Sequence, residues 1–197
     1  MEKESTRQRI LTQALNLFAQ EGYEAVSVDQ IARAVGIKAP SLYKHFKSKR
    51  DIFESILLIM EARDSEQAAA CDLPQEGIDD APEAYAQPSM QDLIAFSKSM
   101  FRYWTEDPFA SAFRRMLTVE QYRSEEMNRL YHQYLGSGPL SYTADLLGSR
   151  EEALLLYGPM HILYSIYDEA QDKHAVLALL NAHLERWNDE LSAQQSL

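Results

Sequence analysis

The chain has little cysteine, proline and glycine, and it lacks a long apolar run. Its one cysteine, Cys71, excludes an internal disulfide and suits a reducing compartment. With seven glycines and seven prolines among 197 residues, there are few positions at which a helix would be broken. Good helix formers such as alanine and leucine are abundant. No stretch of about 18 uncharged apolar residues would span a membrane, and the charged residues 1–10 do not resemble a secretion signal. These absences predict an all-α cytoplasmic protein.

The usual sequence signals of an enzyme are also missing. The five histidines lack metal-ligand spacing, and Cys71 has no histidine close to it in the sequence. Neither a glycine-rich phosphate loop nor a nucleophile elbow is present. We therefore expect no catalytic residue, no metal site and no cofactor.

The chain as a whole has a formal charge of −11. It therefore lacks the net positive charge that favours DNA binding. The charge is unevenly distributed, however. Residues 1–63 hold ten Lys/Arg and eight Asp/Glu, whereas residues 64–197 hold nine and twenty-two. Residues 36–50 contain five cations and no acid. This asymmetry predicts a polyanion-binding surface near the N-terminus; the alternative is a solvated basic turn.

The first thirty-five residues show the periodicity and the capping signals of two helices. Apolar residues at spacings of one, three and four predict a helix over residues 5–20. Gly22 follows at the place where a left-handed residue commonly ends a helix. Ser27 and Gln30 have the spacing of a capping box, which predicts the start of a second helix.

A glycine turn and a third short helix follow. Gly36 supplies a residue that tolerates a tight turn, and residues 38–40 open a helix in which proline is acceptable only in the first turn. Leu42 and Phe46, four residues apart, would face the core, and Ser48 would cap a fourth helix running to about residue 70. Two short helices joined by a glycine, the second exposing cations, are typical of a DNA-binding helix-turn-helix over about residues 27–46.

The stretch SVDQIARAVGIKAPSLYKHFKSKRDIFESIL resembles the N-terminal domain of the TetR family of regulators, and the resemblance covers about residues 5–60. The matching positions are Glu21-Gly22-Tyr23, Ser27, Ile31-Ala32, Val35-Gly36-Ile37, Leu42-Tyr43, His45-Phe46 and Lys49. Pro40 stands where a glycine is frequent in the family. The resemblance implies an all-α TetR-like fold with a three-helix helix-turn-helix domain, residues 1–47, and a larger helical domain for effector binding and dimerisation, residues 48–197.

The resemblance and the chemistry of the side chains together select candidate DNA contacts. Tyr43 and Lys49 are expected on phosphates, and Ser27 is expected there by resemblance. The candidates for base edges in the major groove are Lys38, Ala39, Pro40, Ser41, Lys44 and His45. The alternatives are a half-buried core aromatic for Tyr43 and a packing or capping role for His45.

The remaining residues predict a helical body. Helices are expected at 90–106, 109–122, 124–135, 140–147, 150–171 and 174–192, with a break at 136–139. Residues 71–88 are acidic, aperiodic and proline-bearing, which predicts a flexible loop; a pocket lid is the alternative.

Two sets of residues in this body are candidate binding surfaces. The last two helices have wide apolar faces that could pair with their symmetry mates in a homodimer, through Leu155, Pro159, Ile162, Ile166, Val176, Leu180, His183 and Trp187. Aromatic and sulfur side chains could line an effector pocket, namely Phe101, Trp104, Phe113, Met116, Tyr122, Tyr134, His161 and Tyr164. For both sets the alternative is the protein's own core.

The sequence therefore predicts a transcriptional regulator that binds double-stranded operator DNA. By resemblance it is a repressor that a small-molecule effector releases from a palindromic operator; activation is the alternative. A helical adaptor that binds only protein is a rival, but it leaves the cations of residues 36–50 unexplained.

Overall fold

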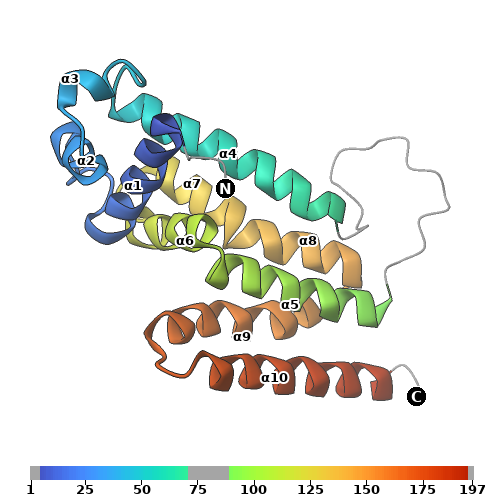
Figure 1. Ribbon diagram of the computed structural model, residues 1–197. Coiled ribbons are helices and arrows are strands. Elements are labelled where there is room, and N and C mark those ends of the chain that lie inside the picture. Colours follow the sequence, from blue (N-terminus) through green and yellow to red (C-terminus); the bar gives the residue numbers. More distant parts are fainter. Residues whose placement is uncertain (1–4, 71–88, 195–197) are drawn as a thin grey trace. The chain divides into compact units, whose positions relative to one another are not determined.

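The computed structural model describes residues 5–70 and 89–194, and within these ranges every regular element is an α-helix (Figure 1). The helices are α1 (Thr6–Glu21), α2 (Val28–Val35), α3 (Ala39–Leu42), α4 (Lys49–Ala70), α5 (Met90–Glu106), α6 (Pro108–Glu120), α7 (Glu125–Tyr134), α8 (Ser137–Leu147), α9 (Arg150–Glu169) and α10 (Lys173–Gln194). The predicted all-α class is confirmed. Cys71 and the predicted loop 71–88 lie outside the described residues.

None of these helices is both long enough and apolar enough to cross a membrane.

The chain divides into two compact units. Unit 1 comprises Met1–Asp72 and Pro108–Tyr131, and unit 2 comprises Leu73–Asp107 and His132–Leu197. Unit 1 therefore contains α1–α4, α6 and most of α7, while α5, α8, α9 and α10 belong to unit 2. This division does not follow the expected boundary at residue 47, because α1 packs on α4 and α6 as well as on α2.

The core of unit 1 is built on the apolar stripe of α1. The buried residues of this stripe are Ile10, Leu11, Ala14, Leu15 and Phe18. Their spacing places them on one helical face, as the sequence periodicity predicts. The neighbouring α4 buries Ile52, Phe53, Ile56 and Met60. Burial of these side chains supplies most of the free energy that holds the short helices α2 and α3 in place.

Two glycines end helices in unit 1 with different backbone conformations. Gly36 is left-handed, with φ 78° and ψ 31°, a conformation that glycine adopts easily in the predicted tight turn. Gly22 also has a positive φ of 87°, but its ψ of 151° is extended. The prediction of a left-handed residue at 22 is therefore wrong: the chain leaves α1 along an extended path toward Tyr23.

Unit 2 is organised around α9, which packs on α5, α8 and α10. Its α8 begins at Ser137 rather than near residue 140, with Gly136 as its N-cap. The predicted break at 136–139 is thus shorter than expected, because Pro139 lies in the first turn of α8, where its missing N–H breaks no helical hydrogen bond.

Candidate nucleic-acid interface

The helix-turn-helix of unit 1 is fixed by local hydrogen bonds at its start and its turn. Ser27 Oγ accepts the Gln30 amide at 3.2 Å, and Gln30 Oε1 accepts the Ser27 amide at 2.7 Å, which completes the predicted capping box. At the turn, the Gly36 and Ile37 amides donate to Arg33 O and Ala32 O. These bonds satisfy groups that a helix end otherwise leaves unpaired, so the sequence defines α2 and its turn locally.

The segment that follows the turn buries one face and exposes the other. Leu42 and Phe46 are at most 1% exposed, as predicted. On the opposite face, five candidate DNA contacts are exposed, namely Lys38, Pro40, Tyr43, Lys44 and His45, and two, Ala39 and Ser41, are partly exposed. Tyr43 is 54% exposed, so about half of its surface is accessible on this face. The segment 38–45 therefore presents a polar and cationic surface on an apolar support.

Lys49 differs from these residues because its ammonium is bound within unit 1. Its Nζ donates to Tyr23 O at 2.8 Å and to Glu24 O at 3.3 Å, and it lies 4.4 Å from the centroid of the Tyr23 ring. A lysine ammonium has three donors, so a single proton remains for a phosphate. Lys49 thus ties the start of α4 to the loop between α1 and α2, and its expected phosphate contact stays a prediction.

Tyr23 is the centre of this loop. Its ring lies 5.1 Å from the rings of both Phe18 and Phe53, which belong to α1 and α4. Burial raises the pKa of Tyr23 above its usual value, opposed in part by Arg50. The ring therefore joins the first and fourth helices beneath the start of α2.

A buried carboxylate from α6 binds the backbone of the same residue, Tyr23, on its amide side. Glu120, the last residue of α6, is 1% exposed, and its Oε1 accepts the Tyr23 amide at 3.0 Å and Arg123 Nη1 at 3.2 Å. A buried carboxylate requires such partners. Glu120 was missed from the sequence because 97 residues separate it from Tyr23, and no local pattern indicates such a contact.

An ion pair makes a second connection to the same part of the chain. Arg50 donates from both terminal nitrogens to the two carboxylate oxygens of Glu126, each at 2.7 Å, and its Nε donates to Glu54 at 2.8 Å. Glu126 raises the pKa of Arg50, and Arg50 lowers the pKa of Glu126. The first turn of α4 is thereby paired with the first turn of α7.

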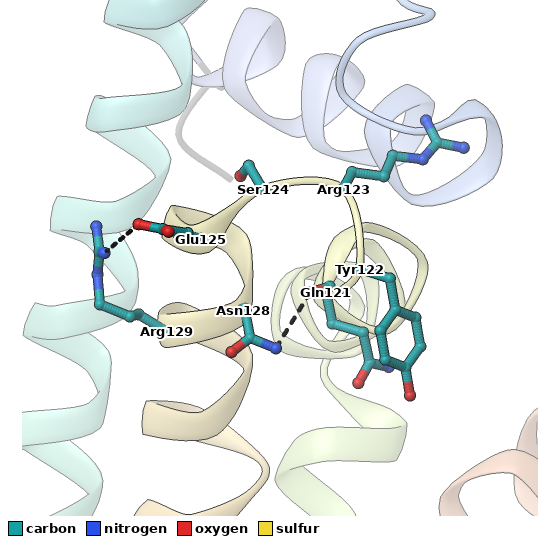
Figure 2. A pocket seen from close by; sticks show the side chains of 7 residues that line it. All are labelled: Gln121, Tyr122, Arg123, Ser124, Glu125, Asn128 and Arg129. Carbon is teal, nitrogen blue, oxygen red and sulfur yellow. Dashed lines mark hydrogen bonds and ion pairs between the residues drawn. The ribbon is translucent and has the colours of Figure 1, made fainter.

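The corner between α6 and α7 has a shallow surface hollow of about 560 Å³ (Figure 2). Its lining residues are Gln121, Tyr122, Arg123, Ser124, Glu125, Asn128 and Arg129. Figure 2 shows that the Arg123 and Arg129 side chains point apart, and Arg129 lies by Glu125 at 4.0 Å. Tyr122 is 88% exposed, which contradicts its expected place inside an apolar pocket: it follows the end of α6 and lies on the surface.

The other candidate effector residues lie in both units, and all of them are buried except His161, which is partly exposed. Phe113 and Met116 are buried in unit 1. In unit 2, the rings of Phe101 and Tyr164 stack with centroids 5.2 Å apart, and His161 lies 6.2 Å from Tyr164. Trp104 and Tyr134, also in unit 2, form a T-shaped pair at 6.3 Å. Five of the eight candidate effector residues thus take part in aromatic contacts within unit 2.

The candidate dimer residues separate into exposed and buried sets. On α9, Leu155, Ile162 and Ile166 are between 44% and 64% exposed, and Pro159 is partly exposed. The spacing of these four residues places them on one stripe of the helix. On α10, Leu179 is 57% exposed. We call the four residues of α9 the α9 face.

The residues expected on α10 are placed differently. Val176, Leu180 and Trp187 are at most 3% exposed, because α10 turns this stripe toward α9 and α5 of its own unit. The Trp187 indole N–H donates to Glu152 of α9 at 3.2 Å, and a ring nitrogen of the partly exposed His183 lies 3.4 Å from Leu156 O. The alternative interpretation, the protein's own core, therefore describes these α10 residues.

Comparison with known proteins gives matches of two kinds. The sequence profile described as bacterial regulatory proteins, tetR family, matches residues 10–56. The HTH-type transcriptional regulator AcrR of Shigella flexneri is 43% identical over 61 residues, which are 31% of this chain and 28% of AcrR. The biofilm operon negative regulator IcaR of Staphylococcus aureus is 44% identical over 48 residues, which are 24% of this chain and 26% of IcaR. The chain thus matches about a quarter of the length of these relatives.

Solved structures extend the likeness to the remaining helices. The fatty acid degradation regulator FadR of Bacillus halodurans has a TM-score of 0.62 at 16% identity, covering 95% of this chain and 96% of FadR. AmtR of Mycobacterium smegmatis has a TM-score of 0.64 at 18% identity, covering 95% and 88%. At such identities the likeness shows the fold alone, and the sequence match is confined to the N-terminal residues. Residues 10–56 therefore match the tetR family of bacterial regulatory proteins, and the chain has the fold of regulators such as FadR and AmtR.

Proposed function

We propose that this protein is a sequence-specific transcriptional regulator that binds a palindromic DNA operator as a homodimer. The observation that carries the proposal is the segment 38–45, whose exposed polar and cationic face rests on the buried Leu42 and Phe46. Lysine can donate to guanine edges, serine can pair with several bases, and the proline ring can contact a thymine methyl group. The segment is thus suited to the major groove.

The α9 face supports the homodimer. Its exposed apolar side chains lie on one side of a long helix, where a second copy could cover them in an isologous contact. One short recognition segment binds weakly, whereas two segments about one turn of DNA apart bind a palindrome together. Dimerisation thus accounts for both the exposed apolar stripe and the operator symmetry that we propose.

A relative supports our proposal for the direction of regulation. IcaR is described as a negative transcriptional regulator, and we propose repression for this protein too. A small molecule bound among the unit 2 aromatics would release the operator, since a ligand that prefers one conformation shifts the population toward it. Glu120 and the Arg50–Glu126 pair support this coupling, because they link the α6–α7 corner to the loop before α2 and to the start of α4, which flank the helix-turn-helix.

Selection of bound fragments from a random DNA pool tests the proposal. We expect the full-length protein to enrich a palindrome, and we expect Tyr43→Phe combined with Lys44→Ala to weaken binding about tenfold and lower the log–log salt slope by about 1 per protomer. Lys49 is left unchanged because its ammonium supports the fold. A Lys98→Ala control removes the same charge from α5 and should bind as the wild type does. Failure to enrich any sequence at low salt, with folded dimer present, would overturn the proposal.

Two substitutions at Ser27 separate its capping role from its expected phosphate contact. Ser27→Ala removes the cap and should lower the free energy of unfolding by about 1 kcal/mol. Ser27→Asp retains a capping oxygen and should leave stability nearly unchanged, but its charge should reduce operator affinity about tenfold through repulsion of the phosphate. Urea unfolding and operator titration measure the two effects. Undiminished affinity of Ser27→Asp would show that no phosphate approaches this residue.

A further inference from the structure

Two arginines in the first two turns of α1 make contacts that their sequence positions do not suggest. Arg7 and Arg9 belong to the N-terminal cations that we counted toward a polyanion-binding surface. In the structure, the guanidinium of each donates to a backbone carbonyl of the helix-turn-helix. These contacts join α1 to the end of α2 and to His45 near the end of the helix-turn-helix.

Arg9 binds the end of α2. Its Nη2 donates to Val35 O, the carbonyl of the last residue of α2. The preceding carbonyls, Ala32 O and Arg33 O, accept the amides of Ile37 and Gly36. Arg9 therefore donates a hydrogen bond to a carbonyl at a helix C-terminus, where a positive charge is favourable. It holds the chain immediately before the turn at Gly36.

Arg7 binds the end of the segment 38–45, which we call the recognition segment. Its Nη1 donates to His45 O at 3.3 Å, its Nη2 donates to Ser55 Oγ at 3.2 Å, and its Cζ lies 4.3 Å from the centroid of the Phe46 ring. Ser55 is 8% exposed and donates its own hydroxyl proton to Asp51 O at 2.8 Å. One guanidinium thus connects α1, the end of the recognition segment and α4.

We propose that Arg7 and Arg9 are positioning residues for operator recognition. They fix the beginning and the end of the segment 36–46 on α1, so that Lys44 and His45 reach base edges in one orientation. Their guanidinium groups donate to the protein, and we expect this role, and not phosphate contact, to determine their effect on binding. The inference rests on the proposed function. It states that Arg7 and Arg9 contribute to the sequence specificity of binding and not to the general attraction for DNA.

The salt dependence of binding distinguishes positioning from phosphate contact. The probes are the palindrome that the wild-type protein selects and an unrelated duplex of equal length, titrated at several salt concentrations. For Arg7→Met and for Arg9→Met we expect the palindrome affinity to fall about tenfold, with the salt slope unchanged. Binding to the unrelated duplex should change less than about twofold, because it depends on phosphate contacts alone. Lys44→Met, the matched control, should lower the salt slope by about 1 per protomer.

A conservative variant and a measurement without DNA complete the test. Arg7→Lys keeps the charge near Phe46 but lacks the planar fork, so it should recover part of the palindrome affinity. In the free protein, amide hydrogen exchange at residues 44–46 should be faster in Arg7→Met than in Lys44→Met or the wild type.

Several results would overturn the proposal. A salt slope lowered by about 1 per protomer in Arg7→Met would identify a phosphate contact. Equal losses on both duplexes would indicate general destabilisation, and an unchanged palindrome affinity would show that the contacts do not matter for recognition. If the wild type selects no palindrome, the proposed function itself fails; unchanged exchange at residues 44–46 would refute the positioning role separately.

Discussion

Replacement of Gly22 by alanine is expected to lower the free energy of unfolding by about 3 kcal/mol or more, the largest stability loss among our predictions. The backbone at Gly22, with φ 87° and ψ 151°, is one that side-chain-bearing residues rarely adopt. An added Cβ would also lie 2.5 Å from Glu120 Oε1 and 2.8 Å from Arg123 Nη1. The buried carboxylate would therefore have to move off the Tyr23 amide. Urea unfolding measures the loss.

The matched control is Gly36→Ala. Gly36 also has a positive φ, 78°, but nothing lies within 4 Å of the Cβ that alanine would add. Only the backbone strain of a left-handed alanine remains, and it costs about 1–2 kcal/mol. In a double-mutant cycle, Glu120→Ala should relieve part of the cost of Gly22→Ala. Equal losses at the two glycines, or strict additivity with Glu120→Ala, would refute the crowding at Gly22.

Replacement of Ile162 by glutamate is expected to dissociate the proposed homodimer. Ile162 is 64% exposed in the protomer and lies within the α9 face. An isologous contact would bring this carboxylate into the interface twice, where desolvation and like-charge repulsion cost several kcal/mol. We expect the dimer dissociation constant to rise at least about a hundredfold, which is about 2.7 kcal/mol. Sedimentation velocity measures it, and operator affinity should fall in parallel.

Leu58→Glu is the control for this change. Leu58 lies on α4 and is 65% exposed, so the same kind of substitution occurs at equal exposure outside the α9 face. This variant should remain dimeric and should bind operator. A dimeric Ile162→Glu protein at micromolar concentration would show that the α9 face is not the interface. Dissociation of both variants would attribute the effect to charge alone.

Local chemistry explains why the starts of the N-terminal helices were predictable. The capping box of Ser27 and Gln30, the left-handed Gly36 and the Ser48 hydroxyl, which accepts the Asp51 amide at 3.1 Å, each act within four residues. Propensity and capping are properties of short segments, and a short segment contains everything needed to recognise them. The helix-turn-helix was therefore found from sequence almost residue by residue.

The supports of that element depend on contacts distant in sequence, and sequence patterns do not contain them. Glu120 and Tyr23 are 97 positions apart, and Arg50 and Glu126 are 76 positions apart. The stripe of α10 shows a related difficulty: periodicity identifies an apolar face but not what covers it. Val176 and Trp187 face α9 and α5, whereas Ile162 on α9 is exposed. Only the packing of the chain separates these cases.

The membership of α6 in unit 1 has a consequence for the construction of hybrid regulators. The apolar stripe of α1 packs on α4 and α6, and Glu120 of α6 binds the Tyr23 amide. A DNA-binding module excised at residue 47 would lose α6 with its buried carboxylate, together with the aromatic partner Phe53 on α4. The transplantable module is instead discontinuous, combining residues 5–70 with residues 108–131. A graft that exchanges operator specificity should carry both segments from the same parent.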